Sequence, residues 1–162
     1  MKIHIIGASG SGKSYLASGL SSKYSIPHYD LDELFWDNSS SYGTKRPAEE
    51  RDKLLSDILK SNDRIIEGVY YDWLDESFKQ ADVIYVMDIK PAICKLRIIK
   101  RFIKRKLRIE PGKNETLRSL FALLKWTDKY FSENLVVIKE RLKQYSNKTV
   151  YITSAKEAKS LI

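Results

Sequence analysis

Short apolar runs alternate with longer amphipathic segments along this chain. Five apolar runs have the length and composition of buried strands, at Lys2 to Ile6, around Pro27 to Tyr29, at Arg64 to Ile66, at Val83 to Met87 and at Thr149 to Ile152. Helical patterns lie between them, beginning near Lys13, after Pro47 and after Pro91, with two more between Glu115 and Lys143. The alternation predicts an α/β fold in which helices cover both faces of a parallel sheet and ligands bind beyond the carboxyl ends of the strands.

The length and composition predict a single domain over residues 1–162. The 162 residues are 43% hydrophobic and 31% charged, without repeats, and one linker-like stretch lies at Asn38 to Gly43. Cys94 is the single cysteine, so no internal disulfide can form, and no Cys/His cluster has zinc-ligand spacing. No apolar run has the length of a signal peptide or a membrane span, so we expect a cytoplasmic protein.

A phosphate-binding motif directly follows the first predicted strand. It matches the Walker A pattern and consists of Gly7, Ala8, Ser9, Gly10, Ser11, Gly12, Lys13 and Ser14. Glycines let the backbone amides wrap around phosphate oxygens, Lys13 supplies charge to the outer phosphates, and the Ser14 hydroxyl suits magnesium. A chance Gly/Ser turn is the alternative, which the strand before and the helix after disfavour. We predict ATP and Mg²⁺ as cofactors.

Three acidic residues follow predicted strands and therefore lie at the expected ligand-binding edge. Asp30 and Asp32 form a pair at the end of the second strand, where alternation could send both carboxylates the same way, and Glu67 ends the third. One carboxylate of the pair could hold hydrated magnesium while the other orients or deprotonates an acceptor hydroxyl. Ser14, Asp30 and Glu67 are thus the candidate metal residues, and helix capping or solvated turns are the alternative. For Asp88 we favour a turn or helix-start role.

Basic residues are concentrated after the fourth predicted strand, within a chain of net charge +8. Arg97, Arg101, Arg105 and Arg108 fall along one helical stripe. Arginine grips phosphate oxygens bidentately, so this stripe suits a lid that closes over phosphates. A solvated charged face is the alternative.

Other candidates for contacting an acceptor lie between the second strand and the second long helix. Lys45, Arg46 and Arg51, near the second long helix, are weaker candidates for holding an acceptor, and Trp36 could line an acceptor pocket. The remaining aromatic residues are better explained by core packing. His4, within the first strand, is expected to pack in the core and not to bind a ligand.

Together these motifs resemble the adenylate-kinase-like P-loop kinases, and within them the bacterial proteins labelled DNA topology modulation protein-related. The resemblance spans most of the chain and rests on Gly7 to Ser14, Tyr29 to Trp36, Ile65 to Tyr70, the arginine-rich segment and Tyr151 to Glu157. It implies a three-layer P-loop NTPase fold with a five-stranded parallel sheet in the order 2-3-1-4-5, and a helical lid at about residues 97–116. It also implies an adenine site between a lid arginine and the loop of Ser154, Ala155 and Lys156. Glu67 stands where those relatives usually carry aspartate.

The leading hypothesis is an ATP-dependent small-molecule phosphotransferase with a nucleoside or nucleotide acceptor. In it, Lys13 and the loop hold ATP, Asp30 and Asp32 position the acceptor, and the catalytic arginines close over the transferring phosphate; these are Arg97, Arg101 and Arg105. The alternative is a nucleic-acid-associated ATP-binding regulator whose basic helix grips a phosphate backbone. A GTPase switch is less favoured because no guanine-reading Asn-Lys-x-Asp sequence is present. A monomer and a homodimer are both compatible with the sequence.

Overall fold

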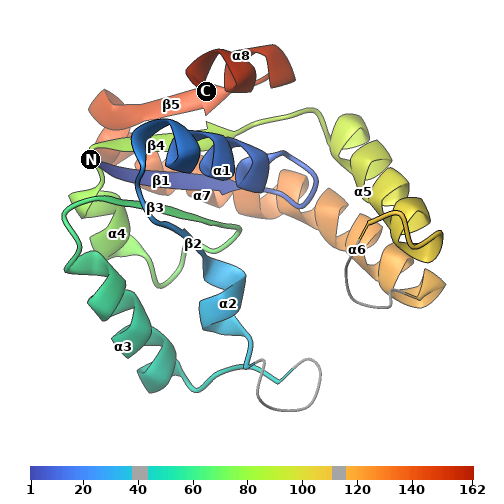
Figure 1. Cartoon of the computed structure of the whole chain (residues 1–162), viewed down its shortest axis with the longest axis horizontal. Helices are drawn as coiled ribbons and strands as arrows, with labels where there is room; N and C mark the ends of the chain where they lie inside the picture. The colour runs from blue at the N-terminus through green and yellow to red at the C-terminus, as the bar shows by residue number, and fades with distance from the viewer. Residues whose placement is uncertain (38–43, 111–115) are drawn as a thin grey trace.

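The computed structural model describes residues 1–37, 44–110 and 116–162 and shows a parallel sheet between two layers of helices (Figure 1). The five strands are β1 (Lys2–Gly7), β2 (His28–Asp30), β3 (Arg64–Gly68), β4 (Val83–Met87) and β5 (Thr149–Ile152). Their order across the sheet is β2-β3-β1-β4-β5, and each neighbouring pair is parallel. The predicted fold class and strand order are therefore confirmed. The linker-like stretch at residues 38–43 and residues 111–115 of the predicted lid lie outside the described residues.

Adjacent residues of the central strand serve two separate cores, because side chains alternate between the faces of a sheet. Ile5 of β1 packs with Leu16 of α1 (Lys13–Tyr24) and Ala158 of α8 (Ala155–Leu161). Ile6 packs on the opposite face with Phe78 of α4 (Asp75–Gln80) and Ile138 of α7 (Leu135–Leu142). In Figure 1, α1 accordingly lies in front of the sheet and α7 behind it.

Two pairs of helices extend away from the sheet in Figure 1, one below it and the other to its right, beyond the carboxyl ends of the strands. One pair is α2 (Leu31–Phe35) with α3 (Ala48–Leu59), and the other is α5 (Pro91–Lys106) with α6 (Leu117–Lys129). Ile98 and Phe102 of α5 pack with Leu120 of α6 in a small core of their own. We call α5 and α6 the arm. The arm joins the body through a π-helical segment, Tyr130–Asn134, before α7, and a 3₁₀ segment, Lys143–Lys148, leads into β5.

The helices that the sequence patterns missed are short. They are α2, α4 and α8, of five, six and seven residues. So few residues complete too little of an apolar stripe to give a 3.6-residue period, and their stability depends on packing and caps. Asp30 caps α2, for example, by accepting a hydrogen bond from the Asp32 amide.

Membrane-spanning helices are absent from the described part of the chain, since none of its helices is both long and apolar enough to cross a bilayer.

His4 packs within the core, as predicted, and is only 1% exposed. Its Nδ1 lies 2.9 Å from Ser77 Oγ, and its ring centroid lies 4.6 Å from that of Phe78. Burial, with the charge of Arg64 as a smaller cause, lowers the pKa of His4 to about 3. The folded protein therefore holds this imidazole neutral through the pH range in which an unfolded histidine takes up a proton.

We expect this buried histidine to make the fold less stable in mild acid. Below pH about 6.5 the unfolded chain binds a proton at His4 that the folded chain does not, so the free energy of unfolding falls by up to about 1.4 kcal/mol per pH unit until the folded pKa is reached. Urea unfolding at pH 7.5 and 5.5 should show a smaller loss in His4→Gln than in the native protein. His28→Gln changes the other histidine and should keep the part of the loss of unfolding free energy that comes from His4. Equal pH slopes in the native protein and His4→Gln would contradict this assignment.

Candidate active site

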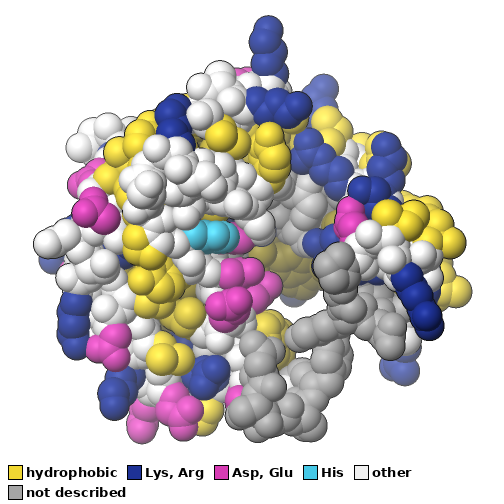
Figure 2. All heavy atoms as spheres, viewed as in Figure 1, with side chains coloured by type: hydrophobic (Ala, Val, Ile, Leu, Met, Phe, Trp, Pro, Cys, Tyr) yellow, Lys and Arg dark blue, Asp and Glu magenta, His cyan; other side chains and the backbone are white. Residues whose placement is uncertain are grey.

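A cavity of about 1130 Å³ lies where the carboxyl ends of β1, β2 and β3 face the arm. Figure 2 shows the molecule hollowed at this place, with acidic side chains gathered on the body side and Lys and Arg side chains around α5. The cavity brings together most of the predicted site, namely Ser9, Gly10, Gly12, Lys13, Ser14, Asp30, Asp32, Glu67, Arg97, Arg101 and Arg105. These residues are distant in sequence and meet because parallel strands end at one edge.

The phosphate-binding loop connects β1 to α1 in a conformation that requires glycine. Gly10 has φ +75° and Gly12 has φ +102°, in the left-handed region that residues with a Cβ rarely adopt. A Cβ on Gly10 would also lie 2.5 Å from the carbonyl oxygen of Cys94, in the first turn of α5. Lys13 begins α1, and its Nζ donates to the Ala8 carbonyl at 3.4 Å. The loop thus provides backbone amides, a lysine and a helix N-terminus at one point, which is the combination that binds phosphate.

Glu67 connects this loop to the third strand through a buried set of polar contacts. Ser14 Oγ donates to Glu67 Oε1 at 2.5 Å, and Lys13 Nζ lies 3.7 Å from Oε2. His28 Nε2 lies 3.7 Å from Oε1, too long for a hydrogen bond but close enough for its charge to act when protonated. Burial alone would raise the pKa of Glu67, but His28, Lys13 and Ser14 together outweigh it and lower that pKa. Glu67 is therefore a carboxylate, and His28 is a neighbour that sequence reasoning missed because no motif marks it.

Asp30 and Asp32 both line the cavity, but they do not lie on one strand as predicted. Asp30 ends β2 and caps α2, while Asp32 lies in the first turn of α2. The predicted alternation is therefore wrong, and helix geometry brings the two side chains to the same space. Burial, then the charges of Glu67 and Asp32, raise the pKa of Asp30 to about 6. Tyr70 Oη donates to Asp32 Oδ1 at 2.8 Å.

Three of the four predicted arginines face the cavity from α5. Arg97 Nη1 donates to the carbonyl oxygens of Gly10 at 3.1 Å and Ser11 at 2.9 Å, so α5 is tied directly to the phosphate-binding loop. Arg101 Nη2 lies 3.5 Å from Ser9 Oγ. Arg108 does not belong to the stripe, because α5 ends at Lys106 and Arg108 follows it with a left-handed φ of 55°.

Other predicted contacts fall outside the cavity. Ser154 caps α8 by accepting from the Glu157 amide at 3.2 Å, and Ser154, Ala155 and Lys156 do not line the cavity, so their role at adenine stays a prediction. Of the three basic candidates near α3, Lys45 lines the cavity, whereas Arg46 and Arg51 do not. Trp36 lines it, as predicted.

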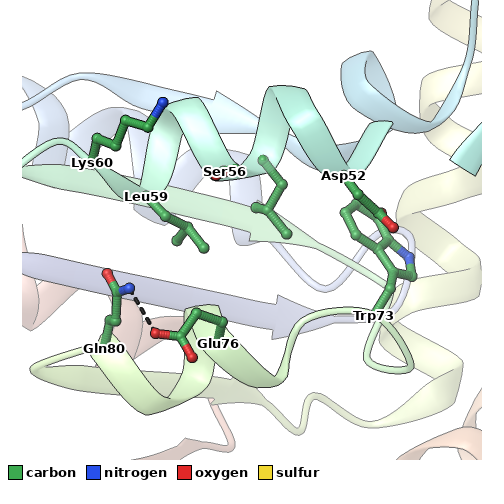
Figure 3. Close-up of a pocket in the computed structure, with 8 residues that line it drawn as sticks. Asp52, Ser56, Leu59, Lys60, Trp73, Glu76 and Gln80 are labelled. Carbon is green, nitrogen blue, oxygen red and sulfur yellow. Dashed lines mark hydrogen bonds between the residues drawn. The ribbon is translucent and has the colours of Figure 1, made fainter. Parts of the chain in front are cut away.

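A second, smaller pocket of about 490 Å³ lies between α3 and α4 (Figure 3). Asp52 and Ser56 of α3 and Lys60 at its C-terminal end border the pocket on one side, with Glu76 and Gln80 opposite. Gln80 Nε2 donates to Glu76 Oε1 at 2.8 Å. None of the phosphate-binding residues lines this pocket, so we assign the chemistry to the larger cavity.

Any metal in the larger cavity would need ligands beyond the protein. The residues that the structure describes contain no group of three or more His, Cys, Asp or Glu side chains placed to hold a metal ion. The Ser14 hydroxyl and the Glu67 carboxylate, already in contact, fit a magnesium ion that takes its other ligands from nucleotide phosphates and water.

The fold and the glycine loop define a P-loop nucleotide-binding protein. Residues 3–118, well over half of the chain, match the family described as AAA domain, and the chain belongs to that family. The chain is also 34% identical over 104 residues to a protein of Bacillus subtilis (strain 168) named uncharacterized protein YqaC. That match covers 64% of this chain and 57% of the relative, so the chain spans less than two thirds of the relative's length.

We expect Gly10→Ala to weaken ATP binding by roughly 10- to 100-fold, because a strained backbone position costs about 1–3 kcal/mol and the new Cβ displaces α5 from the loop. Calorimetric titration with ATP and Mg²⁺ measures this loss. Gly19→Ala makes the same chemical change inside α1, where the added Cβ meets the side chain of Ile162 at 2.5 Å, which can shift. Equal ATP affinities for the two variants would show that the Gly10 conformation is not needed.

Proposed function

We propose that the protein is an ATP-dependent phosphotransferase that acts on a small hydroxylated molecule. One observation carries the proposal: the phosphate-binding loop, the aspartate pair and an aromatic wall share one cavity of about 1130 Å³. This volume lies just above the range of about 300–1,000 Å³ that is usual for a site holding one small ligand, so it suits two ligands side by side. A site that only sensed nucleotide would not need a carboxylate pair beyond the phosphate-binding loop.

The chemistry follows from positions and charges. Ser14 and Glu67, with Asp30 as a further candidate, would hold Mg²⁺, which would neutralise charge on the outer phosphates of ATP. Lys13 holds the outer phosphates, and Arg101 and Arg105 face them from α5. Because its pKa is raised to about 6, Asp30 is a stronger base than an ordinary aspartate yet is still ionised at neutral pH. It can therefore accept the proton of an acceptor hydroxyl.

The nucleic-acid-associated regulator remains the alternative function. It requires basic side chains that point away from the nucleotide cavity, but Arg97, Arg101 and Arg105 line that cavity. Two lysines of α5 are also paired, Lys95 with Asp128 at 2.7 Å and Lys104 with Glu110 at 2.6 Å. Most basic side chains of α5 thus either line the cavity or pair with acidic residues of the same chain, and this supports the phosphotransferase.

ADP release from ATP and Mg²⁺ should be stimulated by at least one nucleoside, nucleotide or small polyol. Lys13→Ala should lower this stimulated rate by on the order of 100-fold or more, because the lysine charge stabilises the transferring phosphoryl group. A coupled spectrophotometric assay measures both. Intact ATP binding without stimulation by any acceptor would contradict the proposal, and nucleic-acid binding that weakens steeply with salt would then favour the regulator.

The stimulated kcat/KM should depend on the protonation of Asp30. It should fall about tenfold per pH unit below a pKa of about 6, because only the carboxylate accepts the proton. Asp30→Asn should lower kcat/KM at pH 7.5 by roughly 10²–10⁴-fold and remove this limb of the profile. Titration of ATP itself is common to both proteins, so the difference between their profiles isolates Asp30. Glu33→Gln, at an exposed acid of the same helix, should behave like the native protein, and a native-like profile in Asp30→Asn would rule Asp30 out as the base.

A further inference from the structure

The part of the cavity lined by Asp30 and Asp32 has an aromatic wall. We call this part the acceptor pocket, formed by Asp30, Asp32, Phe35, Trp36 and Tyr70. Phe35 and Tyr70 stack with centroids 4.6 Å apart and an interplanar angle of 24°, and Trp36 meets Phe35 edge-on at 4.9 Å. Because the rings contact one another, they form a continuous apolar surface suited to a flat ligand.

The basic residues near this pocket are occupied elsewhere. Arg46 Nε donates to the Leu34 carbonyl at 3.0 Å, so this side chain connects the segment before α3 to α2. Arg51 pairs with Asp52 at 2.6 Å and lies over the Trp73 ring at 4.2 Å. Neither arginine lines the cavity. An arginine clamp for an acceptor phosphate is therefore not formed by these residues.

The arginines that do line the cavity belong to its other side. Arg97 contacts the Gly10 and Ser11 carbonyls, and Arg101 lies beside Ser9, so both accompany the phosphate-binding loop. Among the described residues that line the cavity, Lys45 is the one basic residue outside that loop and α5.

Acidic side chains outnumber basic ones around the acceptor pocket, where Lys45 Nζ lies 5.4 Å from the centroid of the Phe35 ring. Asp30 and Asp32 line it, and the Glu67 carboxylate is near enough to act on Asp30 electrostatically. Tyr70 holds one oxygen of Asp32 at 2.8 Å, which orients the carboxylate and leaves its second oxygen for a further hydrogen bond. Tyr70 is thus a positioning residue. A carboxylate pair accepts hydrogen bonds from hydroxyl groups and repels a phosphomonoester, which carries nearly two negative charges.

We propose that the acceptor is an uncharged, hydroxyl-bearing molecule with a flat, partly apolar frame, of the nucleoside type, and that acceptors already carrying a phosphate are rejected. This inference rests on the proposed function and narrows its substrate class. In the reaction, the acceptor hydroxyl oxygen forms a bond to the γ-phosphorus of ATP while the bond from that phosphorus to the β–γ bridging oxygen breaks. The hydroxyl proton passes to Asp30, and ADP leaves with the bridging oxygen.

Matched pairs of acceptors test the proposal: adenosine and AMP, guanosine and GMP, cytidine and CMP, thymidine and TMP. For each compound, calorimetry measures binding to the protein saturated with Mg²⁺ and a non-hydrolysable ATP analogue, which blocks the nucleotide site. The ADP-release assay measures kcat/KM for the same compounds with ATP. At least one nucleoside should be preferred over its monophosphate by on the order of 100-fold in both measurements, since like-charge juxtaposition costs several kcal/mol.

Substitution of one carboxylate locates the cause of the preference. Asp32→Asn removes a charge with little change of shape and should reduce discrimination against the monophosphate by about tenfold. Glu33→Gln removes the neighbouring exposed charge, which does not line the cavity, and should keep native discrimination. Equal discrimination in the two variants would overturn the role given to Asp32.

The outcomes separate the inference from the proposed function. Preference for a monophosphate in any pair, or binding of neither member in every pair, would overturn the inference. Binding preference for a nucleoside without ADP release would support the recognition chemistry while overturning phosphotransfer. ADP release stimulated by monophosphates more than by nucleosides would support a phosphotransferase and overturn the uncharged acceptor.

Discussion

Gly10 of the phosphate-binding loop closely approaches the carbonyl oxygen of Cys94, and this approach places α5 directly against the loop. A Cβ at Gly10 would lie 2.5 Å from that oxygen, so the first turn of α5 can approach the loop only where the residue is glycine. Arg97 then reaches the Gly10 and Ser11 carbonyls from the next turn of α5. The position of the arm, and with it the arginine side of the cavity, depends on this close approach.

Separation of charge is the second consequence of the fold. Parallel strands bring the acids that follow β2 and end β3 to one side of the cavity, while the crossover after β4 brings arginines to the other. Opposite charges across a partly dehydrated space orient ligands whose own charge is uneven. ATP has its charge at one end, which suits the side of the cavity that carries the arginines.

Buried polar groups are organised differently in the core and in the site. His4 is held neutral against Ser77 and Phe78, where it has a purely structural place. Glu67 is equally buried but keeps its charge because Lys13, Ser14 and His28 surround it. A buried carboxylate that remains ionised can bind a cation. His4 and Glu67 are equally buried, so the charge that Glu67 keeps, and not its burial, distinguishes the site from the core.

The sequence by itself determined the strands, the glycine loop with Lys13 and Ser14, and the placing of acids and arginines after particular strands, because these features are local in the chain. The order of the strands came from family resemblance and agrees with the structure. Only the tertiary structure decided that Asp32 reaches the cavity from a helix, that Tyr70 holds it, that Arg46 and Arg51 are occupied, and that Arg108 falls beyond the end of α5. The physical reason is that short helices and side-chain partners depend on packing between segments distant in sequence, which leaves no periodic pattern in the chain.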